Sequence, residues 1–295
     1  MKTKSTYAVM GITGQVGGAV ARALLAAGHN VRGIVRDQAR AAKWESAGVE
    51  LALGDYSNVD ALSAAFRGVD GVFVMLPADF APSPGYPKAH AESLALREAL
   101  TAAMPSKVVA LSSIGAHHPT GLGLITNLHI LEETLASSPM PITFLRPGWF
   151  MENSVWDIDP AMKTGAIPSF LQPLDKPIPM VATSDIGRVA AESLQETWSG
   201  QRVVELEGPS RYSPNDLAEA LSVALGRHIS AVAVPRNEWD SLFLSQGTSD
   251  PAPRIEMLDG FNSDWISFEG NPATHVTGRI DLQSVIQTLV DQRGA

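Results

Sequence analysis

The sequence contains no cysteine among its 295 residues. Disulfides, thiolate metal sites and a cysteine nucleophile are therefore excluded. Long apolar runs are also missing, because the longest, such as residues 69–76, fall far short of the ~20 residues that cross a bilayer. Basic residues are few, since 22 Lys and Arg stand against 31 Asp and Glu, for a net charge of −9. We therefore expect no nucleic-acid partner and no membrane partner.

The chain does have apolar material for a core. Hydrophobic residues make up 45% of the sequence and charged residues only 18%. This composition excludes disorder and predicts a folded cytoplasmic protein of one or two domains.

Short apolar runs alternate with helical patterns over the first half of the chain. The runs are nearly continuous in apolar character, which is typical of strands covered on both faces. They span residues 7–10, 31–35, 49–53, 69–76, 107–112 and 142–146. The alternation predicts an α/β fold with a Rossmann-like, doubly wound parallel sheet.

A glycine-rich turn follows the first predicted strand and opens the first predicted helix. Its spacing is Gly-x-x-Gly-x-x-Gly, at Gly11, Gly14 and Gly17. In this strand–turn–helix setting the pattern indicates a phosphate site for a dinucleotide, with free N–H groups at the helix start. Gly11 would permit the tight turn, Gly14 the approach of pyrophosphate and Gly17 close packing of the helix on the sheet. The predicted cofactor contacts here are Gly11, Thr13, Gly14, Gln15, Val16 and Gly17.

The end of the second strand distinguishes the cofactors. An acid there accepts from a ribose 2′-OH, whereas Arg pairs with a 2′-phosphate. Arg36 ends the strand and Asp37 is placed to cap the next helix. This favours NADP(H), with NAD(H) as the alternative if Arg36 is merely solvated and Asp37 takes the ribose.

Further cofactor contacts are expected where later strands end. Asp55 could accept a hydrogen bond from the adenine amino group, or simply cap a turn. The predicted contacts are Asp55, Tyr56, Leu76, Pro77, Pro147, Gly148 and Trp149.

The second half of the chain has a different texture. Residues 147–179 are rich in Pro and aromatic residues and show no long helical or strand period. We predict a helix over 184–196 with Ser184 as its N-cap, and one from Ser213 to Gly226. Two short helices are expected around Asp250-Pro251. Residues 1–150 are thus expected to form the NAD(P)-binding domain, with 180–204 returning to it. Residues 151–179 and 205–295 would form a smaller α/β substrate-binding lobe.

With these motifs in hand, the sequence resembles the NmrA-like branch of atypical short-chain dehydrogenases/reductases. The segments VALSS at 109–113, FLRPGWFMEN at 144–153 and TSDIGRVA at 183–190 strengthen the resemblance. It implies likeness to NADPH-dependent quinone oxidoreductases and triphenylmethane-dye reductases. The family also contains regulators that bind a dinucleotide without established catalysis.

One feature of the larger superfamily is missing. None of the four tyrosines lies in a Tyr-x-x-x-Lys pair on the helix after the fifth strand, so alcohol–ketone chemistry through an activated Tyr is disfavoured. His129 and Glu133 stand there instead and share one helical face. The resemblance implies that quinone-reductase relatives share this arrangement. His129 is the candidate proton donor, and the alternative is a structural histidine bonded to Glu133 or to a loop carbonyl.

Aromatic side chains follow the sixth strand, on the edge where doubly wound folds bind ligands. The predicted substrate pocket comprises Phe80, His129, Trp149, Phe150, Met151 and Asn153. Packing of the second lobe is the alternative role for each aromatic residue. We expect no metal site, because His117 and His118 lack further ligands and are best placed as exposed loop residues. Arg146 could anchor its strand or contact cofactor, and Asp185 with Arg188 could join the lobes.

Two functions remain open from the sequence. The first is hydride transfer from NADPH to a small quinone-like or conjugated aromatic acceptor, which needs little general acid. The second is a non-catalytic NAD(P)-binding redox sensor. The sequence leaves open whether the protein is a monomer or a homodimer.

Overall fold

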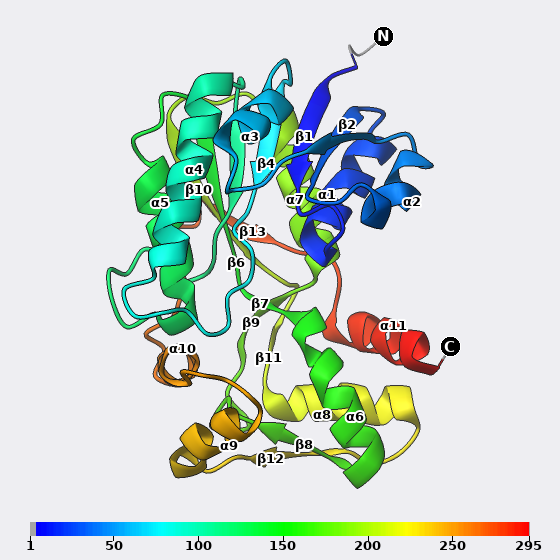
Figure 1. The fold of residues 1–295 in the computed structure, drawn as a ribbon. Coiled ribbons are helices and arrows are strands. Elements are labelled where there is room, and N and C mark those ends of the chain that lie inside the picture. Colours follow the sequence, from blue (N-terminus) through cyan, green and yellow to red (C-terminus); the bar gives the residue numbers. More distant parts are fainter. Residues whose placement is uncertain (1–3, 295) are drawn as a thin grey trace.

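The computed structural model describes residues 4–294. Its centre is a sheet of eight parallel strands in the order β13-β10-β6-β5-β4-β1-β2-β3 (Figure 1). The strands are β1 Thr6–Met10, β2 Asn30–Val35, β3 Glu50–Leu53, β4 Gly71–Val74, β5 Val108–Leu111, β6 Ile142–Pro147, β10 Gln201–Glu207 and β13 His275–Thr277. The order 3-2-1-4-5-6 within it is the doubly wound arrangement. The predicted fold class is confirmed.

Helices cover both faces of this sheet. α1 (Gln15–Ala26) and α7 (Thr183–Gln195) pack together on one face, where Val9, Phe73 and Val109 point. α3 (Val59–Phe66), α4 (Pro87–Ala103) and α5 (Thr126–Leu135) cover the other. Successive strand residues point to opposite faces, so both faces being covered accounts for the continuous apolar runs. A 3₁₀ turn at Ala39–Ala41 and α2 (Ala42–Glu45) follow β2.

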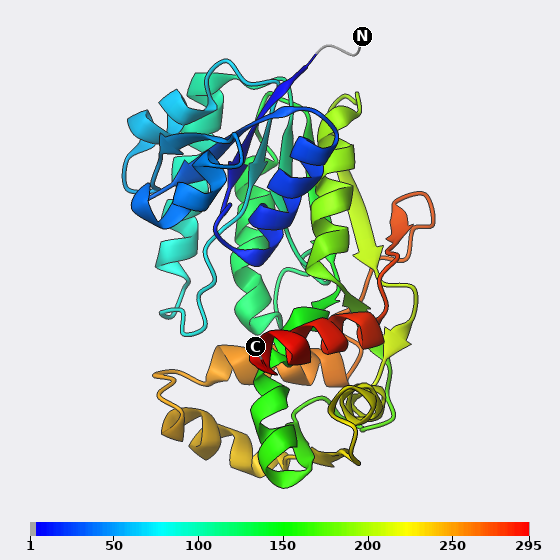
Figure 2. The same cartoon turned by 90° about the vertical axis from the view of Figure 1, so that its right-hand side faces the viewer.

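A smaller lobe lies below the carboxyl ends of the strands (Figures 1 and 2). Its strands form a three-stranded and a two-stranded sheet. They are β7 Trp149–Phe150, β8 Ala166–Ser169, β9 Ile178–Val181, β11 Arg211–Tyr212 and β12 Ser230–Ala233. Its helices are α6 Val155–Thr164, α8 Pro214–Leu225, α9 Trp239–Ser245, α10 Ala252–Asn262 and α11 Leu282–Gly294. Short 3₁₀ turns occupy Gly123–Ile125, Met151–Ser154 and Arg236–Glu238.

Three secondary-structure predictions for the second half are confirmed. Ser213 caps α8 by accepting from the Asp216 N–H at 3.2 Å, and Asp216 accepts in return from the Ser213 N–H at 2.7 Å. Gly226 ends α8 with φ +64°. α9 and α10 flank Asp250-Pro251 as expected.

Three other predictions need correction. Residues 147–179 do contain a regular helix, α6, even though Pro160 lies inside it. Ser184 does not cap α7, which begins at Thr183 with Ala182 at the N-cap position. The cap comes instead from Glu152, whose carboxylate accepts from the Thr183 N–H at 2.9 and 3.0 Å. β13 belongs to the main sheet beside β10, although 205–295 were all assigned to the smaller lobe.

Asp185 and Arg188 tie separate parts of the chain, as one reading of the sequence held. They form an ion pair at 2.9 Å in which Asp185 is 1% exposed. The other Asp185 oxygen accepts from the N–H groups of Arg279 and Ile280 at 2.7 and 2.9 Å. α7 thereby holds the chain between β13 and α11.

Candidate active site

The glycine turn forms an open cradle at the start of α1. Gly11 has φ +65°, which an L side chain rarely adopts, so the sharp exit from β1 requires glycine here. A Cβ on Gly17 would lie 2.3 Å from the Gly11 carbonyl oxygen, so this glycine permits the helix to approach the strand. A Cβ on Gly14 would meet only that same oxygen, at 3.3 Å. The space beside Gly14 is therefore open to a ligand.

The first turn of α1 offers unpaired donors at this cradle. Gly14 is the N-cap residue, and no side chain of the described residues caps the helix. Thr13, Gly14 and Gln15 are exposed. Because the N–H groups of a helix start carry partial positive charge, this end of α1 suits a pyrophosphate. Val16 is buried and could contribute only its backbone.

The end of β2 separates the roles of Arg36 and Asp37. The Asp37 carboxylate accepts from the Ala39 N–H at 2.9 Å and so serves the following turn. Arg36 is exposed, and it forms no hydrogen bond or ion pair with any residue of 4–294. Its guanidinium is the group free to meet a 2′-phosphate.

Asp55 and Tyr56 lie at the neighbouring strand ends. Asp55 accepts from the Ser57 N–H at 2.7 Å, and this hydrogen bond lowers the pKa of its carboxyl. The Tyr56 hydroxyl donates to the Met75 carbonyl just beyond β4, and burial raises its pKa. Leu76 is buried and Pro77 half-buried in the same corner. The adenosine contacts assigned to these residues stay a prediction.

His129 contacts a loop carbonyl and not Glu133. Its Nδ1 lies 2.8 Å from the Ala116 oxygen. A carbonyl only accepts, so Nδ1 carries the proton and Nε2 is left to face other groups. Glu133 is exposed on the solvent side of α5. The catalytic role of His129 stays a prediction.

A buried ion-pair network beneath this site was not predicted. Arg146 donates to both Glu132 oxygens at 2.8 and 2.6 Å, and to Glu269 at 2.7 Å. Ser112 also donates to Glu132. Arg146 therefore anchors the end of β6 to α5 and to the chain before β13, and does not point to a cofactor. The only sequence signal was an arginine inside an apolar strand.

The residues predicted to line the substrate pocket differ in their burial and in their packing partners. Trp149 packs edge-on against Phe261 with ring centroids 5.3 Å apart, and Phe150 packs against the core between the sheet and α1. Phe80 is 71% exposed and Asn153 is exposed. Met151 has no exposed surface, so its placement in a pocket lining is corrected to a core role.

Two further pairs of residues near the site differ from expectation. Pro147 and Gly148 are buried, and a Cβ on Gly148 would lie 2.6 Å from the Pro179 oxygen. His117 and His118 are half-buried and not exposed, because His118 stacks on Trp265 with centroids 4.0 Å apart. Burial lowers the pKa of His117.

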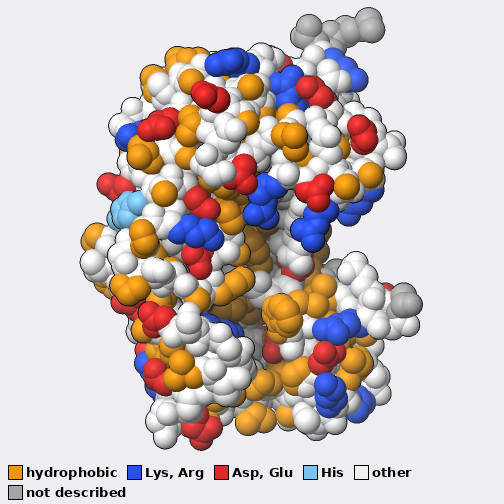
Figure 3. Space-filling view, viewed as in Figure 1, with side chains coloured by type: hydrophobic (Ala, Val, Ile, Leu, Met, Phe, Trp, Pro, Cys, Tyr) orange, Lys and Arg blue, Asp and Glu red, His pale blue; other side chains and the backbone are white. Residues whose placement is uncertain are grey.

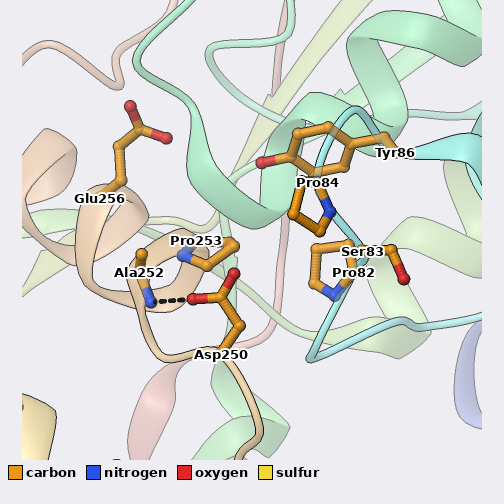
Figure 4. Close-up of a pocket in the computed structure, with 8 residues that line it drawn as sticks. All are labelled: Pro82, Ser83, Pro84, Tyr86, Asp250, Ala252, Pro253 and Glu256. Atoms are coloured by element: carbon orange, nitrogen blue, oxygen red, sulfur yellow. Dashed lines mark hydrogen bonds between the residues drawn. The ribbon is translucent and has the colours of Figure 1, made fainter.

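A cavity of about 310 Å³ opens between the loop after β4 and the start of α10 (Figure 4). Its lining residues are Pro82, Ser83, Pro84, Tyr86, Asp250, Ala252, Pro253 and Glu256. The Tyr86 hydroxyl donates to the Gly123 carbonyl at 3.0 Å, and Glu256 accepts from the Gly123 N–H at 3.0 Å. Gly123 thereby fastens the loop and α10 to each other. None of these residues belongs to the substrate pocket expected from the sequence.

The space-filling view shows a hollow between the two parts of the molecule (Figure 3). Between the sheet domain above and the smaller lobe below, the surface is deeply indented and lined with hydrophobic side chains (Figure 3). Lys and Arg side chains stand on its upper edge. Across residues 4–294 no group of three or more His, Asp or Glu side chains could hold a metal ion. No helix in that range is long and apolar enough to cross a membrane.

Comparison with known proteins decides the family. The model of the NmrA-like family matches residues 3–250. The chain belongs to the NmrA-like family. Among curated relatives of this NmrA-like chain, the NAD(P)H azoreductase of Xenophilus azovorans is 31% identical over 283 residues, covering 92% of each chain. Quinone oxidoreductase 2 of Escherichia coli is 25% identical over 248 residues, covering 82% of each.

Solved structures share the fold. The Citrobacter sp. triphenylmethane reductase complexed with NADP(H) superposes with TM-score 0.79 at 21% identity, covering 96% of this chain and 99% of that one. The NADPH-dependent quinone oxidoreductase of Escherichia coli gives TM-score 0.78 at 22% identity, with the same coverage.

Proposed function

We propose that this NmrA-like protein transfers a hydride from NADPH to a planar, conjugated acceptor such as a quinone or an aromatic dye. It is an NAD(P)H-dependent oxidoreductase of the NmrA-like type, as its relatives' names imply, and the acceptor class is the new element. The observation that carries the proposal is the apolar hollow between the sheet and the smaller lobe, at the end of the sheet where β1 leads into α1 (Figures 1 and 3).

The residues of the cradle fit the dinucleotide. The uncapped N–H groups at Gln15 and Val16 would hold the pyrophosphate, and the free Arg36 guanidinium would pair with the 2′-phosphate. When bound, NADPH would supply the hydride, which carries one proton and two electrons. The chain then has to orient the acceptor and exclude water from the hydride transfer. A neutral quinone becomes an anion that still needs one proton, whereas a cationic dye becomes neutral and needs none.

The side chains of this protein can meet those needs. Apolar walls around the hollow bind a flat acceptor and exclude water from the reacting atoms. The reduced acceptor takes its proton from solvent or from Nε2 of His129, which can donate only while the ring is doubly protonated. No activated tyrosine is needed, because a conjugated acceptor stabilises the negative charge it receives.

A panel of acceptors tests this function. Aerobic oxidation of NADPH is followed by absorbance with neutral quinones, cationic dyes and no acceptor. We expect oxidation that depends on at least one planar acceptor. In Gly14→Val the added side chain occupies the cradle, and φ of −92° accommodates valine, so the variant should fold yet lose both NADPH binding and turnover. NADPH binding without oxidation of any acceptor would instead indicate a non-catalytic sensor.

A further inference from the structure

Glu92 is a half-buried carboxyl group on α4 that the fold does not use. It forms no hydrogen bond and no ion pair with any residue between 4 and 294. Ala89 and Leu96, three residues before and four residues after it, lie on the same side of the helix. Both are buried in the core cluster that also receives Tyr56. Glu92 therefore lies beside the packed face of α4, in the second turn of a helix that begins just beyond the loop after β4, at the carboxyl edge of the sheet.

Tyr56 lies at the same edge of the sheet, because its hydroxyl is held by the Met75 carbonyl just after β4. Arg36 follows β2 and Asp55 follows β3, so both belong to this carboxyl edge together with the start of α4. The charge effects agree with this placement. The pKa of Tyr56 is raised first by burial and then by the Glu92 carboxylate. The pKa of Glu92 is itself raised, first by burial, and Asp55 adds to the rise while Lys88 and Arg36 oppose it.

This carboxyl edge is where a doubly wound sheet holds the adenosine half of a dinucleotide. The adenine amino group presents two N–H donors at the edge of the ring, and it needs acceptors from the protein. One carboxylate oxygen of Asp55 already accepts a hydrogen bond from the Ser57 N–H at 2.7 Å. Glu92 has both oxygens free. A carboxylate that is partly removed from water and unpaired costs free energy, and a donor on a ligand removes that cost.

We propose that Glu92 accepts a hydrogen bond from the adenine amino group of the bound dinucleotide and so selects adenine over bases with a carbonyl at that position. This inference rests on the proposed function and deepens it by assigning base recognition to α4. Arg36 would bind the 2′-phosphate of the cofactor, whereas Glu92 would bind the adenine base.

The test compares NADPH with its hypoxanthine analogue, in which a carbonyl oxygen replaces the adenine amino group. Dissociation constants come from fluorescence titration of the reduced nicotinamide with the full-length protein, so no turnover is required. We expect the wild type to bind the analogue at least about tenfold more weakly, the scale of a hydrogen bond to a charged group. Glu92→Met should bring the ratio close to one by weakening NADPH. Glu92→Gln should lie between, because its amide oxygen still accepts.

Glu98→Gln is the matched control, since Glu98 is exposed on the same helix, and it should keep the wild-type ratio. Equal affinities of the wild type for both dinucleotides would overturn the inference. So would an unchanged ratio in Glu92→Met, and in both cases NADPH would still bind and the proposed function would stand. Failure of the wild type to bind NADPH at all would reject the proposed function together with the inference.

Discussion

The two sides of the interlobe hollow are built in different ways. The proposed cofactor side centres on the segment from Gly11 at the end of β1 to Arg36 at the end of β2, with Asp55 and Tyr56 beyond β3 beside it, and its main donors are backbone N–H groups. The cavity that we take as the acceptor side joins the loop at 82–86 to the start of α10, more than 160 residues further along. On our proposal, cofactor binding depends mainly on local backbone geometry, whereas acceptor binding depends on how distant segments pack.

Their carboxyl groups show the same contrast. On the cofactor side, the Ser57 N–H stabilises the charged form of Asp55 and lowers its pKa. In the smaller lobe, Asp157 lies in the first turn of α6 without a hydrogen-bond or ion-pair partner among residues 4–294, and burial raises its pKa to about 7. A buried carboxyl group that has no hydrogen-bond or ion-pair partner lowers the stability of the fold. Such groups are found more often at functional sites than elsewhere.

The largest effect is expected from Gly17→Ala on the cofactor side. The new Cβ would lie 2.3 Å from the Gly11 oxygen and 2.5 Å from the Met10 oxygen, and neither backbone atom can move without displacing β1. We expect a loss of unfolding free energy above about 5 kcal/mol, measured by chemical denaturation. Gly14→Ala is the control, and should cost less than about 1 kcal/mol. A stable Gly17→Ala would show that the turn is not tightly packed.

The next largest effect is expected where the sheet meets the chain before β13. Arg146→Met removes the only ion-pair partner that residues 4–294 offer Glu132, which is 7% exposed. An uncompensated buried charge costs about 3–5 kcal/mol of unfolding free energy. Arg293→Met breaks an exposed pair with Asp159 and should cost about 1 kcal/mol or less. Similar losses in the two variants would contradict a structural role for the buried network.

The strand, glycine turn and helix that would hold the cofactor could be predicted from the sequence for a physical reason. Gly11, Gly14 and Gly17 act through the backbone of adjacent residues, and apolar continuity marks strands covered on both faces. Arg36 and Asp37 could be separated because an Asp two residues before a turn N–H commonly caps it. These patterns involve residues close together in the sequence, so they can be recognised without knowing how the chain packs.

The remainder depended on contacts between residues far apart in sequence. The cap of α7 comes from Glu152 and not from adjacent Ser184. Arg146 finds Glu269, 123 residues away. The helix α6 overrides the unfavourable Pro160 because its other side is buried against the lobe core, where Ile158 and Ala161 have no exposed surface. No local pattern encodes these partners.

A smaller and more selective effect is expected from Arg36→Ala. Loss of a charge-assisted hydrogen bond to the 2′-phosphate should weaken NADPH binding by about 1.5–3 kcal/mol. NADH lacks that phosphate, so its affinity should hardly change, and it serves as the internal control. Both affinities are measured by fluorescence titration. Equal losses for the two cofactors would mean that Arg36 supports the end of β2 and does not select the cofactor.

The smallest effect concerns Asp157 and appears only as a dependence on pH. Its folded-state pKa of about 7 lies above the ordinary value of 3.8, so the folded state holds the proton more tightly than the unfolded state does. The stability this proton contributes is fully present below about pH 4 and is lost as the pH rises through 7. Asp157→Asn removes the charge, so we expect the variant to unfold at the same denaturant concentration as wild type near pH 4. Near pH 8 it should be more stable by about 1–2 kcal/mol. Asp159→Asn, two residues on and paired with Arg293, should show no such gain. A gain for Asp157→Asn that does not vary with pH would mean that packing, and not ionisation, sets the cost of this carboxyl in the smaller lobe.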